Sequence, residues 1–156
     1  KRAAKYGRED AITFGMRLQI VCRETEEAAW AEARRLIEGA TRFQLANIRT
    51  GKSAVESIRR TSDANRRVWE LLAESGDDMK IHPHLWTGIS TVRAGAGIAV
   101  VGTPAQVAAT LDEFVEAGCT TFCLSGYPHA QEARNFTRSV MPYFDGRIAE
   151  QLPTVA

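Results

Sequence analysis

The stretch GIAVVGTPAQVAATLDEFVEAGCTTFCLSG, residues 97–126, decides the fold that we expect for this chain. It begins and ends with short apolar runs that are typical of buried strands. Between them lies a helical segment with clear end signals, since Thr103 can cap its first turn and Gly118 follows its last. Its apolar positions recur at helical spacing: Val107, Leu111, Phe114 and Val115. The order of strand, helix and strand predicts two parallel strands joined by a crossover helix.

A further strand is expected N-terminal to this unit, over residues 11–22 (AITFGMRLQIVC). Alternation places apolar side chains on one face, while the opposite face carries Arg17 and Gln19. A helix follows directly, with Thr25 as its cap and Gly39 at its end. Polar residues on one strand face favour a barrel, whose inner side can be polar near its mouth, over an open doubly wound sheet with two apolar faces.

The remaining segments complete an α/β pattern. Residues 41–80 read as a helical insertion, residues 81–97 as a glycine-rich loop and residues 129–144 as a final helix. We therefore expect one α/β domain over residues 1–156 with three strand–helix units. Three strands are few for a barrel that needs eight, so the chain is expected to be the C-terminal portion of a (β/α)8 TIM barrel within a longer protein. A small open sheet is the alternative.

The composition is that of an ordinary globular protein with no bias toward nucleic acid or membrane. The chain has 156 residues and a net charge of +1. Acidic and basic residues interleave, as in RETEEAAWAEARR, so no single-sign face is predicted. No apolar run reaches the roughly 18 residues of a membrane span, and KRAAKYGRED at the start lacks the apolar core of a signal peptide. We expect a cytoplasmic protein.

Three other features carry no chemistry in our interpretation. The GKS segment resembles the end of a phosphate-binding loop, but the upstream glycine of that motif is replaced by Ala46. His82 and His84 are spaced like ligands, yet no carboxylate or cysteine accompanies them, so we expect no metal site. Cys119 and Cys123 lie four apart in a strand, which predicts that both are small buried hydrophobes on one face.

The sequence SGYPH, residues 125–129, lies where the last strand ends. Functional groups of parallel α/β proteins gather at the carboxyl ends of their strands. Backbone amides and the Ser125 hydroxyl are available there to a ligand, and the phenol of Tyr127 can donate a hydrogen bond to developing negative charge. Tyr127 packed under Pro128 and His129 as a helix cap are the structural alternatives.

Two segments together carry a resemblance to a known family. They are FGMRLQIVCRETEEAAWAEARRLI, residues 14–37, and LWTGISTVRAGAGIAVVGTPAQVAATLDEFVEAGCTTFCLSGYPHAQEA, residues 85–133. They resemble the C-terminal part of the bacterial-luciferase-like flavin monooxygenases and are most similar to the alkanesulfonate monooxygenase group. The ordered pair VRAGAGIAVVGTP and LSGYPH is more specific than either half alone.

The resemblance implies a (β/α)8 barrel of which this chain holds the last three strands. It implies a two-component system in which a separate NAD(P)H-dependent reductase supplies reduced FMN, which then reacts with O2. In the alkanesulfonate group this chemistry cleaves a carbon–sulfur bond and yields an aldehyde and sulfite, without a metal. A homodimer or homotetramer is also implied.

The resemblance also implies roles for individual residues. It places Arg17 on a strand facing the active site and Arg93 on a mobile lid that excludes water. The implied catalytic residues are Arg17, Arg93 and Tyr127. The implied cofactor-binding residues are Ser125, Gly126 and Tyr127. The implied substrate-binding residues are Gln19, Arg93 and His129. For the two arginines the alternatives are a structural ion pair and simple solvent exposure.

One position departs from the family pattern. Relatives that cleave sulfonates carry a His two residues after the strand Arg, whereas this chain has Gln19. Glutamine forms hydrogen bonds but does not exchange a proton near neutral pH. A luciferase-like oxygenase acting on a sulfone or a heterocycle is therefore an alternative. A noncatalytic barrel remnant that serves in binding or assembly is a second one.

Overall fold

The structure is a computed structural model that describes residues 3–48, 63–92 and 97–145. The strands are β1 (Phe14–Cys22), β2 (Lys80–His82), β3 (Leu85–Trp86), β4 (Ile98–Gly102) and β5 (Cys119–Ser125). The helices are α1 (Glu26–Ile48), α3 (Asp63–Glu74), α4 (Ile89–Val92), α5 (Pro104–Glu116) and α6 (His129–Ser139). Three 3-10 turns lie at Ala4–Tyr6, Glu9–Ala11 and Met141–Tyr143.

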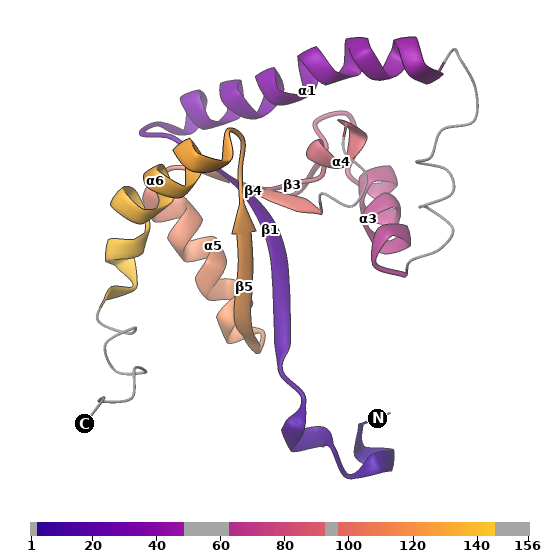
Figure 1. The fold of residues 1–156 in the computed structure, drawn as a ribbon, viewed down its shortest axis with the longest axis vertical. Coiled ribbons are helices and arrows are strands. Elements are labelled where there is room, and N and C mark those ends of the chain that lie inside the picture. The colour runs from indigo at the N-terminus through magenta and orange to yellow at the C-terminus, as the bar shows by residue number, and fades with distance from the viewer. Residues whose placement is uncertain (1–2, 49–62, 93–96, 146–156) are drawn as a thin grey trace.

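The five strands form one mixed sheet in the order β2-β3-β4-β1-β5. β1 is central and pairs in parallel with both β4 and β5, as Figure 1 shows. The expected α/β fold with parallel strands is therefore confirmed. The sheet is open, and β1 lies between β4 and β5, whereas a closed barrel places strands that are successive in sequence side by side. The closed barrel stays a prediction.

The hairpin of β2 and β3 is the main difference from the sequence-based expectation, which had a loop over residues 81–97. The two strands contain three and two residues, too few for alternation to be recognised in a sequence. β3 is held by pairing antiparallel to β4, with Trp86 opposite Ala99. Tertiary pairing therefore decides the conformation of this segment.

Helices cover both faces of the sheet. On one face, α1 and α4 pack on β1 and β4, and Trp30 meets Trp86 edge to face with ring centroids 6.5 Å apart. On the other face, α5 and α6 pack on β1 and β4. The second cluster comprises Leu18, Ile20, Cys22, Val100, Val107, Ala108, Leu111 and Val140. In Figure 1, α1 crosses the carboxyl ends of the strands, so the polar face of β1 is covered there.

The expected end signals of the crossover helix α5 are confirmed. Thr103 accepts a hydrogen bond from the Gln106 backbone N–H, and the Gln106 side chain accepts one from the Thr103 N–H at 2.8 Å, which forms a capping box. Gln106 Nε2 also donates to Glu26 Oε2 at 2.8 Å. The cap therefore links the start of α5 to the start of α1. Gly118 follows α5 with φ at 97°, a conformation that favours glycine.

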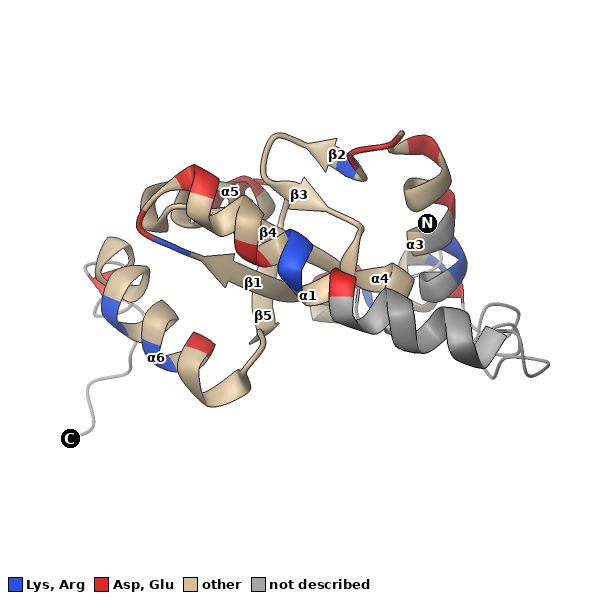
Figure 2. Ribbon diagram, turned by 90° about the horizontal axis from the view of Figure 1, so that it is seen from above, with Lys and Arg blue, Asp and Glu red and all other residues tan. Residues whose placement is uncertain are grey.

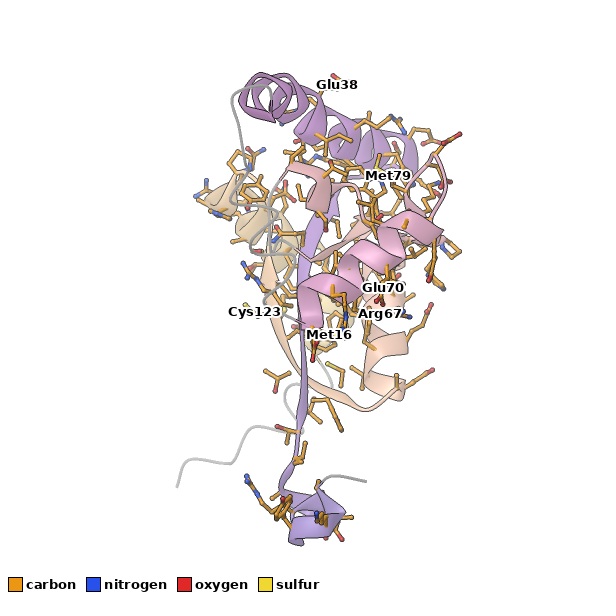
Figure 3. All side chains as sticks on the ribbon, turned by 90° about the vertical axis from the view of Figure 1, so that its right-hand side faces the viewer. Met16, Glu38, Arg67, Glu70, Met79 and Cys123 are labelled. Atoms are coloured by element: carbon orange, nitrogen blue, oxygen red, sulfur yellow. The ribbon has the colours of Figure 1, made fainter. Side chains whose placement is uncertain are left out.

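The two cysteines of β5 are not on one face, which corrects the sequence-based expectation. Cys119 is buried, while Cys123 is exposed, and Figure 3 labels Cys123 on this strand. The register between β1 and β5 shifts by one residue next to Phe14. A β-bulge of this kind interrupts the alternation, so a four-residue spacing no longer keeps two side chains on the same face.

The surface of the described residues carries charges of both signs. Figure 2 shows Lys and Arg among Asp and Glu on α3 and α6, whereas the charged residues of α5 are all acidic. On α3, Arg67 and Glu70, labelled in Figure 3, pair at 3.2 Å. None of the helices in the described part of the chain is long and apolar enough to span a bilayer.

Candidate functional site

The carboxyl ends of β1 and β5 bring several of the predicted site residues together. Gln19 of β1 is the register partner of Ser125 of β5, and side chains of directly paired residues lie on the same face of a sheet. Gly126 follows at once and lies so close to β1 that a Cβ on it would be 2.7 Å from the Ile20 carbonyl oxygen. Only glycine fits this approach of the two strands.

The face under α1 holds Gln19 and Tyr127. Both border a small void with no room for a water molecule, together with Leu36, Trp86 and Gly126. Gln19 is 1% exposed. Tyr127 packs against the core cluster on this face, and its ring centroid lies 4.8 Å from that of His129. This side of the site is therefore closed in the described structure.

The face under α6 holds an open cavity of about 530 Å³. A volume of this size lies within the range of small-molecule sites. Most of the wall is apolar, and the lining residues are Ile20, Phe122, Leu124, Ser125, Gly126, His129, Glu132, Ala133, Phe136 and Thr137. We call this space the β5–α6 cavity. Three of the predicted site residues, Ser125, Gly126 and His129, belong to it.

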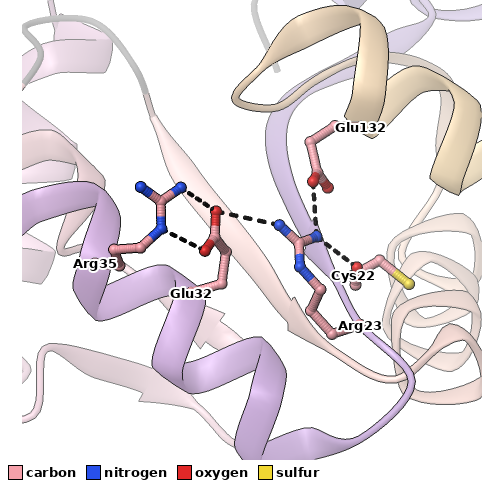
Figure 4. Close-up of polar contacts among 5 residues, drawn as sticks. All are labelled: Cys22, Arg23, Glu32, Arg35 and Glu132. Carbon is pink, nitrogen blue, oxygen red and sulfur yellow. Dashed lines mark hydrogen bonds and ion pairs between the residues drawn. The ribbon is translucent and has the colours of Figure 1, made fainter.

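An ion-pair chain that sequence reasoning missed adjoins this cavity (Figure 4). Glu132, in the first turn of α6, is 3% exposed, and its Oε1 accepts a hydrogen bond from Arg23 Nη1 at 2.7 Å. Arg23 Nη1 also donates to the Cys22 carbonyl oxygen at 2.7 Å, and Arg23 Nη2 pairs with Glu32 Oε1 at 3.2 Å. Arg35 then pairs with Glu32 at 2.6 Å.

Two groups in this chain have shifted pKa values, one because of charge and one mainly because of burial. The hydrogen bonds and charge of Arg35, together with Arg23, hold the pKa of Glu32 below its ordinary value. Burial raises the pKa of the Cys22 thiol to about 11, and the nearby carboxylate of Glu132 adds to the shift. Cys22 is therefore a neutral thiol at physiological pH and has no thiolate to act as a nucleophile.

Two buried oxygen atoms at this end of the sheet lack a hydrogen-bond partner among the described residues. They are Ser125 Oγ and Glu132 Oε2. An ionised carboxylate accepts about four hydrogen bonds, and leaving a buried acceptor unsatisfied costs about 1–3 kcal/mol. Unsatisfied buried groups of this kind are uncommon in folded proteins and are found at ligand and water sites. Both atoms are buried acceptors that the described residues leave without a donor.

The sequence contains a local signal for each member of the Arg23–Glu132 pair but none for their contact. Arg23 directly follows the buried end of a strand, where a charged side chain needs a partner. Glu132 stands in the first turn of a helix, where an acidic residue is favoured by the helix dipole. Their pairing across 109 residues depends on how α6 packs against β1, and no local pattern encodes that contact.

Of the two predicted arginines, the structure describes only Arg17, which lines neither space. Arg17 is exposed on β1, opposite Cys123, and forms no ion pair within the described residues. Arg93 lies outside the described residues, so its lid role stays a prediction. Tyr127 is thus the predicted catalytic residue that the structure places beside Gln19.

The histidines of β2 and the following turn have structural partners. His82 Nε2 lies 3.4 Å from Glu113 Oε2 on α5, and His84 Nδ1 lies 3.2 Å from the Val101 carbonyl oxygen. Across the part of the chain that the structure describes, no three His, Cys, Asp or Glu side chains are grouped so as to hold a metal ion.

Comparison with known families identifies the protein class. The model of the luciferase-like monooxygenase family matches residues 1–121. This chain belongs to the luciferase-like monooxygenase family. The match runs from the N-terminal turns through β1, β4 and α5 into β5, so it includes Arg17 and Gln19 and ends before Ser125. Members of this family are monooxygenases that typically use reduced flavin.

Proposed function

We propose that this luciferase-like protein is a two-component monooxygenase that uses reduced FMN and O2. Its proposed reaction cleaves the carbon–sulfur bond of a small alkanesulfonate and releases an aldehyde and sulfite. The family match over residues 1–121 supports the reaction class. The convergence of Gln19, Ser125 and Tyr127 at the carboxyl ends of neighbouring strands supports a site at this end of the sheet. A separate NAD(P)H-dependent flavin reductase and a homo-oligomer belong to the proposal.

The described residues match only part of a flavin. The buried Ser125 hydroxyl, which has no partner among them, suits a hydrogen-bonding group of the ring or the ribityl chain. The void beside Gln19 and Tyr127 has no space for it, and the wall of the β5–α6 cavity carries Glu132 but no Lys or Arg for the phosphate. We therefore derive no step through the flavin, although a bound reduced flavin would supply the electrons that activate O2.

The roles proposed for the chain's own residues concern hydrogen bonding and charge. Tyr127 donates a hydrogen bond to negative charge that develops on an oxygen atom, and Ser125 with the Gly126 backbone helps to position the ligand. Gln19 orients the substrate through its amide, and His129 contributes a ring nitrogen at the start of α6. Arg17, on the same strand face as Gln19, provides the cation for a sulfonate, and Arg93 closes over it.

A second candidate function is oxygenation of an uncharged sulfone or heterocycle. Two observations favour it. Gln19, which cannot act as an acid or base, is 1% exposed and lies within the site. Arg17, the cation proposed for a sulfonate, is exposed on the strand rather than enclosed with Gln19 and Tyr127.

The deciding experiment measures sulfite release from a series of linear alkanesulfonates. Full-length protein is supplied with FMN, NAD(P)H, O2 and a flavin reductase, and parallel reactions omit the reductase. The Gln19→His variant tests the departure from the family pattern, with Gln131→His, an exposed position of α6 outside both spaces, as the matched control.

Sulfite that depends on the reductase, and that rises in Gln19→His but not in Gln131→His, is the expected result. If no sulfonate in the series gives sulfite while reduced FMN still binds, the sulfonate proposal fails. The same enzyme would then be assayed with sulfones and heterocycles by oxygen consumption.

A further inference from the structure

We propose that Arg23 and Glu132 are positioning residues, whose ion pair fixes Tyr127 in place at the end of the sheet. The inference rests on the proposed function, in which Tyr127 donates a hydrogen bond to charge that develops on an oxygen atom. Neither member of the pair is proposed to touch the substrate. The pair acts on residues 125–129, the segment that joins β5 to α6 and carries Tyr127.

Glu132 holds this segment from the side of α6. Its backbone N–H donates to the Pro128 carbonyl oxygen at 3.0 Å, so the first turn of α6 ties these two residues together. Its aliphatic stem lies against Gly126, where an added Cβ would be 2.7 Å from both Cβ and Cγ of Glu132. Tyr127 stands in the chain between these two points of contact. A displacement of Glu132 therefore moves the residues on both sides of Tyr127.

Arg23 fixes Glu132 to the sheet. Its Nη1 donates to Glu132 Oε1 and to the Cys22 carbonyl oxygen, each at 2.7 Å. The Arg23 backbone N–H donates to the Gly102 carbonyl oxygen at 3.2 Å. Cys22 and Gly102 are the last residues of β1 and β4, two strands that pair in parallel. The position of Glu132 is thus set by the ends of two paired strands.

The same guanidinium reaches the helix on the other side of Tyr127. Arg23 Nη2 pairs with Glu32 Oε1 of α1 at 3.2 Å, as Figure 4 shows. One turn further along α1, Leu36 borders the small void together with Tyr127 and Gln19. Arg23 therefore connects α1 and α6, the two helices next to Tyr127.

The burial of this pair also favours a positioning role. Glu132 is 3% exposed, and the desolvation of a buried ion pair cancels much of its Coulombic attraction. Apolar side chains of similar volume often stabilise such a contact equally well. The hydrogen bonds between a guanidinium and a carboxylate are directional, whereas apolar contacts are not. The pair therefore gives residues 125–129 a defined position rather than additional net stability.

The first measurement reads the surroundings of Tyr127 without any turnover. In the full-length protein, 3-fluorotyrosine is placed at position 127, and its fluorine NMR signal is recorded for the parent, Arg23→Met and Arg23→Lys. We expect Arg23→Met to shift and broaden this signal. Lysine keeps the charge beside Glu132 but lacks the planar fork that reaches Glu132 and Glu32 together. Its signal should lie between the other two, and this variant provides the comparison if Arg23→Met does not fold.

Two controls separate this effect from a loss of stability. Arg35→Met removes the outer pair with Glu32, where the Arg35 side chain is 63% exposed, and leaves Arg23 on Glu132. Val107→Ala opens a cavity in the apolar core under α5 and destabilises the fold, although Val107 has no part in the ion-pair chain. Under conditions in which every variant is folded, both controls should give the fluorine signal of the parent.

The second measurement is turnover in the monooxygenase assay. Arg23→Met should lower kcat at least tenfold while KM for the substrate changes less than threefold, because a displaced phenol loses a contact made in the transition state. In a Tyr127→Phe background, the same Arg23→Met change should lower kcat less than threefold, since the phenol that the pair positions is already absent. A residue that only stabilises the fold would lower kcat equally in both backgrounds.

Three results would overturn the proposal. The first is an unchanged fluorine signal in the Arg23 variants. The second is a signal that Val107→Ala alters as much as Arg23→Met does, because the effect would then follow stability. The third is an equal loss of kcat with and without the Tyr127 phenol. If no substrate is turned over, the proposed function fails, and the fluorine signal alone still decides whether the pair positions Tyr127.

Discussion

Replacement of Arg23 by Met should destabilise the protein by about 3 kcal/mol. Arg23 is the central cation of the chain in Figure 4, and the methionine keeps most of its apolar length. Its loss leaves the carboxylate of Glu132, 3% exposed, without a charge partner and removes the donor to the Cys22 carbonyl oxygen. Breaking a buried pair costs about 3–5 kcal/mol, and the lower end applies because the Arg23 side chain is 22% exposed.

The control is Arg35→Met at the outer end of the same chain. The Arg35 side chain is 63% exposed, and an exposed pair contributes about 0–1 kcal/mol because solvent screens it. Urea unfolding at neutral pH gives the free energy of unfolding for each variant, provided that the slope with denaturant is unchanged. We expect Arg23→Met to cost at least about 2 kcal/mol more than Arg35→Met.

A double-mutant cycle isolates the contact between the two residues. Glu132→Gln is combined with Arg23→Met, and the double variant should be more stable than the sum of the two single changes predicts, by about 1 kcal/mol or more. If Arg23→Met costs no more than Arg35→Met, or if the two changes are additive, the guanidinium does not hold Glu132 in the way that the structure shows.

The remaining predictions concern packing, pH and catalysis. Gly126→Ala should lower the free energy of unfolding, measured in urea, by about 1–3 kcal/mol, because the added Cβ would lie 2.7 Å from the Ile20 carbonyl oxygen. Gly15→Ala is the control: the nearest atom to a Cβ there is 3.4 Å away, so the free energy of unfolding should change little. Folding raises the pKa of the Cys22 thiol from 9.0 to about 11. Between these pH values the thiol ionises more readily in the unfolded chain, so the stability that the neutral thiol gives the folded state below pH 9 is lost as the pH rises to 11. The free energy of unfolding should therefore fall by up to about 3 kcal/mol more in the parent than in Cys22→Ala over this window, and an equal fall would contradict it. Tyr127→Phe should lower turnover more than stability, and equal turnover would remove this residue from the proposed site.

Elements whose ends depend on a few neighbouring residues could be predicted from the sequence. The capping box at Thr103 and the positive φ at Gly118 are properties of a few neighbouring residues, so the bounds of α5 were predictable. The strands β1, β4 and β5 have apolar runs long enough to be recognised. The hairpin of β2 and β3 is held by its pairing with β4, and the strand order places β1 between its two parallel neighbours. Neither property is encoded within one segment.

The candidate site likewise combines residues that the sequence was enough to select with residues that it was not. The rule that ligands meet the carboxyl ends of parallel strands was enough to select Ser125, Gly126 and Tyr127. Glu132 was missed because its importance comes from burial and from Arg23, which is 109 residues away. The exposure of Cys123 was missed because the bulge next to Phe14 shifts the alternation of β5. Each miss concerns a contact between elements rather than a property of one.

The two sides of the sheet differ in the ligands that they can accept. Alternation along β1 puts Arg17 and Gln19 on one face and Ile20 on the other, so the cation proposed for a sulfonate and the β5–α6 cavity lie on opposite faces. The cavity has a carboxylate and apolar walls, which disfavour an anion. An anionic substrate is therefore expected on the Gln19 face alone. Hexane-1-sulfonate that shifts amides of β1 near Arg17 but leaves Ala133 unaffected would support this division, whereas shifts at Ala133 that Ala133→Leu abolishes would contradict it.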